Sequence, residues 1–368
     1  MSIIFLDHNS TTKISDEVIN KMLEVYQMPL NSSAIHQLGR RANFLIEEAN
    51  NYIKKLLNAD NYEIIYTSSS TEATNTVFFG TDSNDILFSK IEHASVYNCR
   101  PNNKRIHEIN VQKNGLIDKE DLKNKIPKNK TFLVSAMLAN NETGAIQNVE
   151  EISKLTHQNF GLIHCDLVQA IGKINVDIEK INPDYAVISA HKINGPQGVG
   201  ALLIRKGLDI KPLIHGSKQQ KSKRAGTMNI AGIAGFGEAC NQAKKNLEKY
   251  HEISKLRNYL EDSLKNIAGE NLKIFCSEVN RLANTSFIAL KNIDSQTQLI
   301  NFDLNGICVS SGSACSSGSL DQSRVLKAMG VSDEFLKGAI RISLGHENSI
   351  SDVNKFIQVW HEFYKKFY

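Results

Sequence analysis

Residues 185–205 have the sequence YAVISAHKINGPQGVGALLIR. Two apolar runs, 185–190 and 201–205, flank a short polar and glycine-rich stretch, a pattern typical of the buried strands of an α/β sheet. Lys192 follows the first run directly. A partly desolvated lysine at the carboxyl end of a strand can form a Schiff base, because desolvation lowers its pKa. The alternative is a surface lysine that leads into a turn, and this stretch by itself leaves both open.

Short apolar runs of the same kind precede this stretch, and segments with helical spacing separate several of them. The runs span residues 63–67, 86–89, 132–138 and 162–165, and helices are expected over 15–27 and 37–59. Strands and helices in alternation predict a mostly parallel sheet with helices on both faces. The expected fold class is therefore α/β, with a large domain of residues 15–252.

From about residue 250 the pattern changes. A long helix, strands over 285–290 and 339–343 and a final helix over 351–368 predict a smaller α+β domain of residues 253–368, which the N-terminal segment 1–14 joins. In the final helix, aromatic residues recur at helical spacing: Phe356, Trp360, Phe363 and Phe367. We expect them to pack in a core rather than to form a docking surface.

Composition narrows the class of protein. With 368 residues, 41% of them hydrophobic, the chain is long enough for two lobes, and its net charge of +4 without a basic block does not imply direct binding of nucleic acid. The six cysteines contain no Cys-x-x-Cys pair, so neither a zinc ribbon nor a disulfide scaffold is indicated, and no metal is expected. No run approaches the roughly 18 apolar residues of a membrane span, and the N-terminus lacks a signal-peptide pattern. We expect a cytoplasmic protein.

Polar side chains follow the ends of the expected parallel strands, where ligands bind in sheets of this class. Ser68–Glu72 follows the first run and opens a helix. Its hydroxyl and N–H groups could hold a phosphate, although a simple helix cap has the same composition. Asp166 could pair with a protonated pyridine nitrogen or could cap a loop. We expect these groups to converge on one rim of the sheet.

Cys315 lies within SSGSACSSGS, residues 310–319, a stretch too small and polar to pack in a core. A thiol on a loop that can move is better suited to a nucleophile than to core packing. Cys308 and Cys165 have apolar neighbours, and we expect both to be ordinary core residues.

Together these segments resemble the cysteine desulfurases, which are pyridoxal 5'-phosphate enzymes of the class V aminotransferase fold. The resemblance extends from Leu6 to Gly345, nearly the whole chain. Its marks are Leu6–Thr12, Ser70–Glu72, Glu92–His93, Asn140–Gly144, His164–Asp166 with Gln169, Ser189–Lys192, Arg224–Thr227, Ser310–Cys315 and Ser343–Gly345. So many ordered matches are far more specific than any single motif, and they favour the functional interpretation of each. The resemblance implies a fold type I large domain, like that of aspartate aminotransferase, followed by a small C-terminal domain.

The resemblance also implies roles for the matching residues. Lys192 would hold the cofactor and shuttle protons, His93 would stack on the pyridine ring and assist acid–base steps, and Asp166 would pair with the ring nitrogen. The remaining cofactor contacts would be Ser70, Thr71, Ser189 and His191 around the phosphate, Asn141 and Gln169 near the phenolic oxygen, and Thr227 at the phosphate of the partner subunit. The substrate would be held by Asn31, Asn141 and Arg341, the last through its bidentate guanidinium.

The implied activity is removal of sulfur from L-cysteine, which yields L-alanine and a persulfide on Cys315. A homodimer with composite sites is implied, as is a protein acceptor such as an iron–sulfur scaffold or a carrier for tRNA thiolation. Two alternatives are another class V aminotransferase or lyase, which would not need Cys315, and a non-catalytic assembly subunit of the same fold.

The sequence departs from the family pattern in three places. Leu30-Asn31-Ser32 stands where the family usually has Gly-Asn-Pro, and residues 215–220 are HGSKQQ where the family has a His-Gly-Gly-x-Gln-Glu run. The chain also stops soon after its last expected helix, whereas longer members carry an extension that docks the iron–sulfur scaffold. We therefore expect weak binding to a scaffold that depends on that extension.

Overall fold

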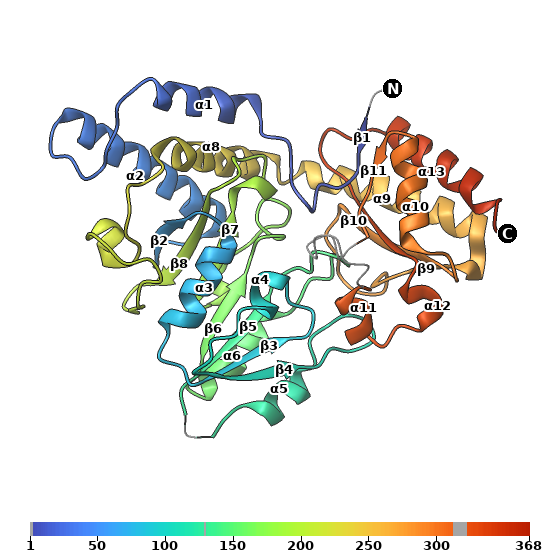
Figure 1. Ribbon diagram of the computed structural model, residues 1–368, viewed down its shortest axis with the longest axis horizontal. Coiled ribbons are helices and arrows are strands. Elements are labelled where there is room, and N and C mark those ends of the chain that lie inside the picture. Colours follow the sequence, from blue (N-terminus) through green and yellow to red (C-terminus); the bar gives the residue numbers. More distant parts are fainter. Residues whose placement is uncertain (1–2, 129, 312–321) are drawn as a thin grey trace.

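A seven-stranded sheet forms the centre of the larger part of the molecule (Figure 1). The computed structural model describes residues 3–128, 130–311 and 322–368. In spatial order the strands are β2 (Tyr62–Thr67), β8 (Gly200–Arg205), β7 (Tyr185–Ser189), β6 (Leu162–Asp166), β5 (Phe132–Met137), β3 (Asp85–Ser89) and β4 (Arg105–Ile109). Only β8 runs against its neighbours in this sheet, so the prediction of a mostly parallel sheet is confirmed.

Apolar cores cover both faces of this sheet. Successive residues of one strand alternate between them: Leu203 and Ala186 belong to the core under helices α2 and α8, whereas Leu202 and Val187 belong to the core under helix α3. Such two-sided burial is why the strands are continuous apolar runs in the sequence. The helices of this part are α1 (Asp16–Tyr26), α2 (Gln37–Leu57), α3 (Ser70–Gly80), α4 (Ala94–Tyr97), α5 (Lys119–Lys125), α6 (Val149–Gln158), α7 (Ile178–Ile181) and α8 (Ile230–Asn246).

A third core belongs to an antiparallel sheet of order β12-β10-β9, which lies to the right in Figure 1. Its strands are β9 (Leu272–Ile274), β10 (Thr285–Leu290) and β12 (Ala339–Ser343), and the helices around it are α9 (Lys249–Ala268), α10 (Ser295–Leu304), α11 (Arg324–Ala328), α12 (Asp333–Leu336) and α13 (Ile350–Tyr364). The N-terminal strand β1 (Ile4–Phe5) pairs in parallel with β11 (Ile307–Cys308) beside this sheet.

The helices and strands that the sequence predicted are present, with small errors at their ends. Strand β4 was missed because His107 and Glu108 interrupt its apolar pattern at the edge of the sheet. The expected domain boundary at residue 252 falls in the first turn of α9. We propose that the boundary lies at the start of that helix. Within the described ranges, no helix is long and apolar enough to cross a membrane.

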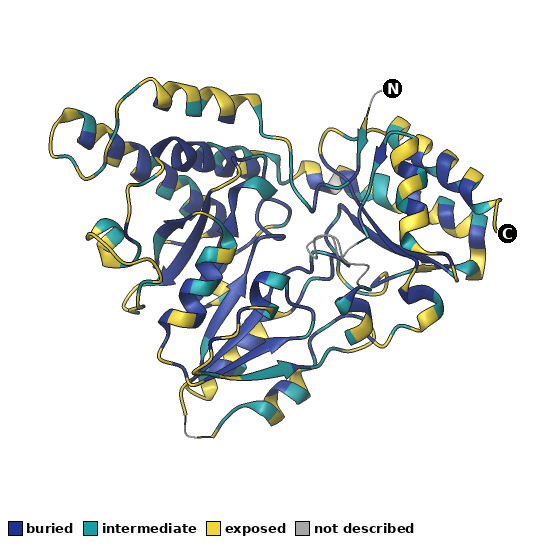
Figure 2. Cartoon of the chain, in the orientation of Figure 1, coloured by how far each residue is buried: buried dark blue, intermediate teal, exposed yellow. Residues whose placement is uncertain are grey.

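The terminal helix α13 packs its aromatic face inward, as its spacing predicts. Phe356, Trp360 and Phe363 are buried, and the ring of Phe356 stacks on Phe302 at a centroid distance of 4.7 Å. Phe367 lies beyond the helix and is 47% exposed, so the core prediction is wrong for this residue alone. Figure 2 shows the same division, with the inward side of this helix buried and its outer side exposed.

We expect Phe356→Ala to lower the free energy of unfolding by about 3–5 kcal/mol, because it removes a buried ring and leaves a cavity. Urea unfolding measures this change. Phe367→Ala is the matched control and should stay within about 0.5 kcal/mol of the unmodified protein. Equal losses in the two variants would contradict the buried position of α13.

Candidate active site

A cavity of about 420 Å³ lies at the carboxyl ends of the parallel strands. Strands β2 and β7 both end beside Gly200, the first residue of β8, so their terminal segments meet at one edge. Ten of the residues singled out from the sequence line this cavity: Ser70, Thr71, His93, Asn141, Asp166, Gln169, Ser189, His191, Lys192 and Arg341. The expected convergence on one rim of the sheet is therefore confirmed.

The start of helix α3 forms one end of the cavity. Ser69 caps the helix by accepting a hydrogen bond from the Glu72 backbone N–H, which leaves Ser70 and Thr71 in the first turn. A Cβ atom on Gly200 would lie 2.7–2.8 Å from the Ser69 and Ser70 backbone, so glycine permits this close approach of β8. Hydroxyls at the positive end of a helix are well placed for an anion.

His93 follows β3 and begins helix α4. Its Nδ1 accepts the Ser95 backbone N–H at 3.2 Å, so the proton of the neutral ring is on Nε2. Burial, followed by the positive charges of Lys192, Arg324 and Arg341, lowers the pKa of His93 to about 4. The imidazole is therefore neutral near pH 7.

The buried carboxyl of Glu92 holds the segment before His93. Its Oε1 accepts hydrogen bonds from the Ser89 hydroxyl at 2.8 Å and from the Met137 N–H at 2.9 Å, which ties the end of β3 to β5. Burial raises the pKa of Glu92 to about 8. His93 is thus carried on a rigid connection between two strands.

Asp166 ends strand β6 and points a carboxyl into the cavity. Its Oδ1 accepts the Val168 N–H at 2.8 Å, which orients the group. Burial raises its pKa to about 6, against the opposing effects of that hydrogen bond and of the Lys192 charge. In this buried environment a cationic partner would stabilise the ionised form of the carboxyl group.

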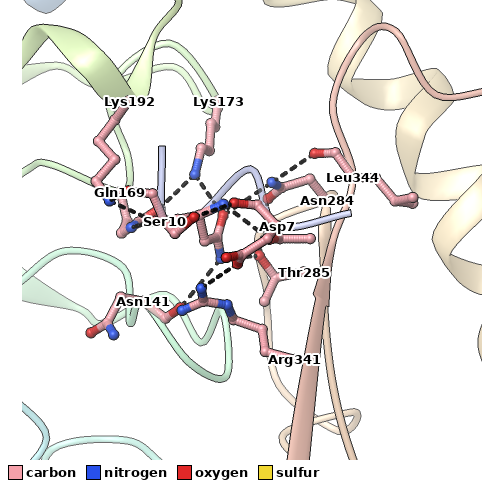
Figure 3. Close-up of polar contacts among 12 residues, drawn as sticks. Asp7, Ser10, Asn141, Gln169, Lys173, Lys192, Asn284, Thr285, Arg341 and Leu344 are labelled. Atoms are coloured by element: carbon pink, nitrogen blue, oxygen red, sulfur yellow. Dashed lines mark hydrogen bonds and ion pairs between the residues drawn. The ribbon is translucent and has the colours of Figure 1, made fainter. Parts of the chain in front are cut away.

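Lys192 lies after β7, on the short 3₁₀ turn Ala190–Lys192. Its Nζ donates to the backbone carbonyls of Asn9 and Ser10 at 2.6 and 2.5 Å (Figure 3). The adjacent His191 contacts the same N-terminal segment, through Nδ1 to the Thr11 hydroxyl at 3.1 Å. The N-terminal segment therefore supplies acceptors for the amine of Lys192.

Arg341 comes from β12 and brings the smaller sheet to the cavity. It is 3% exposed, and its guanidinium donates to the Asn141 carbonyl at 2.8 Å and to the Asp7 carboxylate at 2.6 Å. Its Nε is buried and has no hydrogen-bond partner among the described residues. Asn140 shapes the turn that presents Asn141, because its Oδ1 accepts the Glu142 and Thr143 N–H groups.

Two buried residues in the network around this cavity carry no role in the sequence interpretation. Asn9 is 1% exposed, lines the cavity and contacts Lys192 and Gln169; Lys173 is 3% exposed and contacts both Asn9 and Gln169. The available signal for Lys173 was its place in the apolar run Ala-Ile-Gly-Lys-Ile, where a charged residue is unusual.

Two predicted site residues, Asn31 and Thr227, are not brought to the cavity of their own chain. Asn31 is exposed, and its side chain accepts the Ser33 N–H. Thr227 is exposed as well, while Arg224, three residues earlier, is anchored to Glu72 of α3 at 3.0 Å. Cys315 lies outside the described residues.

The two segments that depart from the family pattern lie side by side. Ser32 and Ser33 line a second cavity, of about 560 Å³, together with Gln219 and Gln220 along the edge strand β2. The side-chain amide of Gln220 forms the two hydrogen bonds that a neighbouring strand would form with Tyr66. Its Oε1 accepts the Tyr66 N–H, and its Nε2 donates to the Tyr66 carbonyl.

The groups present fit pyridoxal 5'-phosphate. This cofactor needs an amine for covalent attachment, an anion for the pyridinium nitrogen and donors for a phosphate. Lys192 supplies the amine, Asp166 the carboxylate, and the first turn of α3 with Ser189 and His191 supplies hydroxyl and imidazole groups, all within one cavity.

Comparison with known proteins identifies the family of the chain. The family model for aminotransferase class V matches residues 4–356. A cysteine desulfurase IscS of Dictyoglomus turgidum is 39% identical, over 97% of this chain and 93% of that protein. The solved structure of a NifS-like protein from Rickettsia africae superimposes with a TM-score of 0.92 at 40% identity, over 99% of both chains. A structure described as SspA in complex with cysteine has a TM-score of 0.80 at 26% identity, over 93% of this chain and 98% of that one.

The match spans both sheets and nearly the full length of each relative, so it concerns the whole enzyme rather than a shared part. The chain therefore belongs to the aminotransferase class-V family and, within it, to the cysteine desulfurases.

Proposed function

We propose that the protein removes sulfur from free L-cysteine, with pyridoxal 5'-phosphate attached to Lys192 and Cys315 as the sulfur-accepting nucleophile. The observation that carries this proposal is the convergence of Lys192, His93, Asp166 and Arg341 on one cavity. The cysteine complex of the SspA neighbour supports the choice of substrate.

Each wall of the cavity has a part in holding the cofactor. Ser70, Thr71, Ser189 and His191 would hold the phosphate, and Asp166 would pair with the ring nitrogen. The neutral His93 would contact the pyridine ring, and Asn141 and Gln169 would serve the phenolic oxygen. The bound cofactor supplies an electron sink for the charge left when the Cα–H bond of the substrate breaks.

The residues of the chain perform the other steps. Arg341, which lines the same cavity as Lys192, orients the substrate carboxylate. The amine of Lys192, once released from the cofactor, removes the Cα proton and returns it to the substrate. Its hydrogen bonds to the Asn9 and Ser10 carbonyls hold the amine within the cavity between these transfers.

Sulfur transfer needs a soft nucleophile. The Cys315 thiolate attacks the substrate sulfur, so that an S–S bond forms, the C–S bond of cysteine breaks and the three-carbon fragment leaves as alanine after protonation. Burial raises the pKa of all five described cysteines, Cys99, Cys165, Cys240, Cys276 and Cys308. A thiol with a raised pKa is a poor source of thiolate, which supports the assignment of this step to Cys315.

We further propose a homodimer in the cytoplasm in which Thr227 and Asn31 serve the neighbouring site. Both are exposed in the single chain, and the loop before Thr227 packs along the β2 edge next to the segment of Asn31. The persulfide would pass to a protein acceptor for iron–sulfur cluster assembly or tRNA thiolation.

Lys192→Ala is expected to abolish covalent attachment of the cofactor, because no other amine lines the cavity in the described part of the chain. Borohydride reduction followed by peptide mapping locates the label in the unmodified protein. Lys206→Ala, an exposed control, should keep full attachment. A reduced label on any other lysine would end this assignment.

Cys315→Ser should bind cysteine and give the same early spectral changes, because proton removal belongs to Lys192. Sulfide release under reducing conditions should fall by about two orders of magnitude or more, since a serine hydroxyl without its own base replaces a thiolate. Cys308→Ser, the half-buried neighbour in β11, should retain activity. Wild-type sulfide release by Cys315→Ser, or a persulfide mapped to Cys308, would overturn the proposal.

If Thr227 serves the neighbouring site, the enzyme should sediment as a dimer. Thr227→Val should then weaken cofactor retention without dissociating the dimer. Retention is measured as the fraction of cofactor left after dialysis. A monomer with full cofactor occupancy would contradict the assignment of Thr227.

A further inference from the structure

Lys173 is a buried amine without a carboxylate partner in the described part of the chain. It lies in the turn after β6, is 3% exposed, and forms no ion pair with any residue of the described ranges. Gly172 before it has a φ of +70°, and a Cβ atom there would lie 2.8 Å from Ile193, so the turn that directs Lys173 inward requires glycine. Burial of a lysine amine costs free energy of folding unless its N–H groups form hydrogen bonds.

Both hydrogen bonds of Lys173 go to side-chain amide oxygens. Its Nζ donates to Gln169 Oε1 at 2.6 Å and to Asn9 Oδ1 at 2.8 Å. Because the Lys173 amine donates both hydrogen bonds, each amide turns its oxygen toward the lysine. The Gln169 Nε2 is thereby turned the other way, where it donates to the Asn9 carbonyl at 2.9 Å.

The Asn9 carbonyl links this group to Lys192. It accepts Gln169 Nε2 and also Lys192 Nζ, the latter at 2.6 Å. Lys173 therefore fixes, through two amides, both the acceptor of the Lys192 amine and the end of Gln169 that faces the cavity. Figure 3 shows Lys173, Gln169 and Lys192 close together, with dashed lines for the hydrogen bonds among the residues drawn.

We propose that Lys173 is a positioning residue for the reaction, which holds Gln169 and Asn9 in the orientations that present the Gln169 amide N–H₂ to the cofactor and the Asn9 carbonyl to Lys192. This inference rests on the proposed function. It assigns no contact between Lys173 and the substrate. It explains why the chain retains a buried amine at a place where an apolar side chain would avoid the cost of desolvation.

Lys173→Met keeps the length of the side chain and removes the donor. The test is a pH titration of the visible absorption of the cofactor-bound enzyme. We expect the apparent pKa of the absorption change to rise by at least about half a unit, because removal of a donor and a nearby amine favours the protonated form at the Lys192 nitrogen. Lys173→Gln retains a donor and should shift the titration by less than half as much.

Arg281→Met is the control for a general loss of a buried cation. Arg281 is also buried and is paired with Glu261 at 2.9 Å, away from the cavity. The Arg281→Met variant should have a lower melting temperature and an unchanged absorption titration. If Lys173→Met behaves in the same way, losing stability without any shift, Lys173 has only a structural role and the inference is wrong.

The route through Gln169 is tested by a double-mutant cycle. Lys173→Met is introduced into Gln169→Leu, and the pKa shift that it causes is compared with the shift in the unmodified enzyme. Residues that act as one unit are strongly non-additive, so the second shift should be less than half of the first. Equal shifts in both backgrounds would show that Lys173 acts independently of Gln169.

A cofactor-free measurement separates this inference from the proposed function. Competitive acylation of the cofactor-free protein, followed by mass spectrometry, reports the pKa of the Lys192 amine, which should rise in Lys173→Met. If the unmodified enzyme releases no sulfide from cysteine but the shift is present, the proposed function fails and the positioning role stands. If sulfide is released and neither titration shifts, the positioning role fails alone.

Discussion

The active site depends on one buried asparagine whose hydrogen bonds join the smaller sheet to the turns that follow β6 and β7. The Asn9 N–H donates to the Ser343 hydroxyl at 2.9 Å, and its side chain contacts Thr285, Asn284 and Lys173 at distances of 2.8–3.1 Å. Buried polar groups of this kind are costly when unpaired. The N-terminal segment is therefore held beside the smaller sheet. Its carbonyls accept the hydrogen bonds that position the Lys192 amine.

The same burial sets the chemistry of the cavity. Low solvent exposure lowers the pKa of His93 and raises that of Asp166, so the ring is neutral while the carboxyl favours a cationic partner. The pKa of Lys173 is also lowered well below its usual range, by burial first and then by Lys192 and Arg341. These shifts follow from the position of the cavity between two apolar cores, which keeps water away from the titratable groups.

Much of the fold could be predicted from local patterns. The apolar runs predicted β7 and β8, because strands buried on both faces lack polar interruptions. Ser15 predicted the start of α1, because its side chain accepts the Val18 N–H in the first turn of the helix. Strand β4 could not be found in this way, since an edge strand carries charged residues such as Glu108. The site residues at strand ends were found because the direction of a parallel strand fixes the edge at which it ends.

Periodicity and order along the chain determined the α/β class and the rim of the sheet, and the resemblance of the sequence to the cysteine desulfurases implied roles for the ten residues that line the cavity. Only the tertiary structure decided that Asn9 and Lys173, which are 164 residues apart, share a hydrogen bond, and that Thr227 and Asn31 lie outside the cavity of their own chain. No local pattern carries such information. A long-range contact depends on how two sheets close over a buried polar group, and that closure is a property of the packed chain.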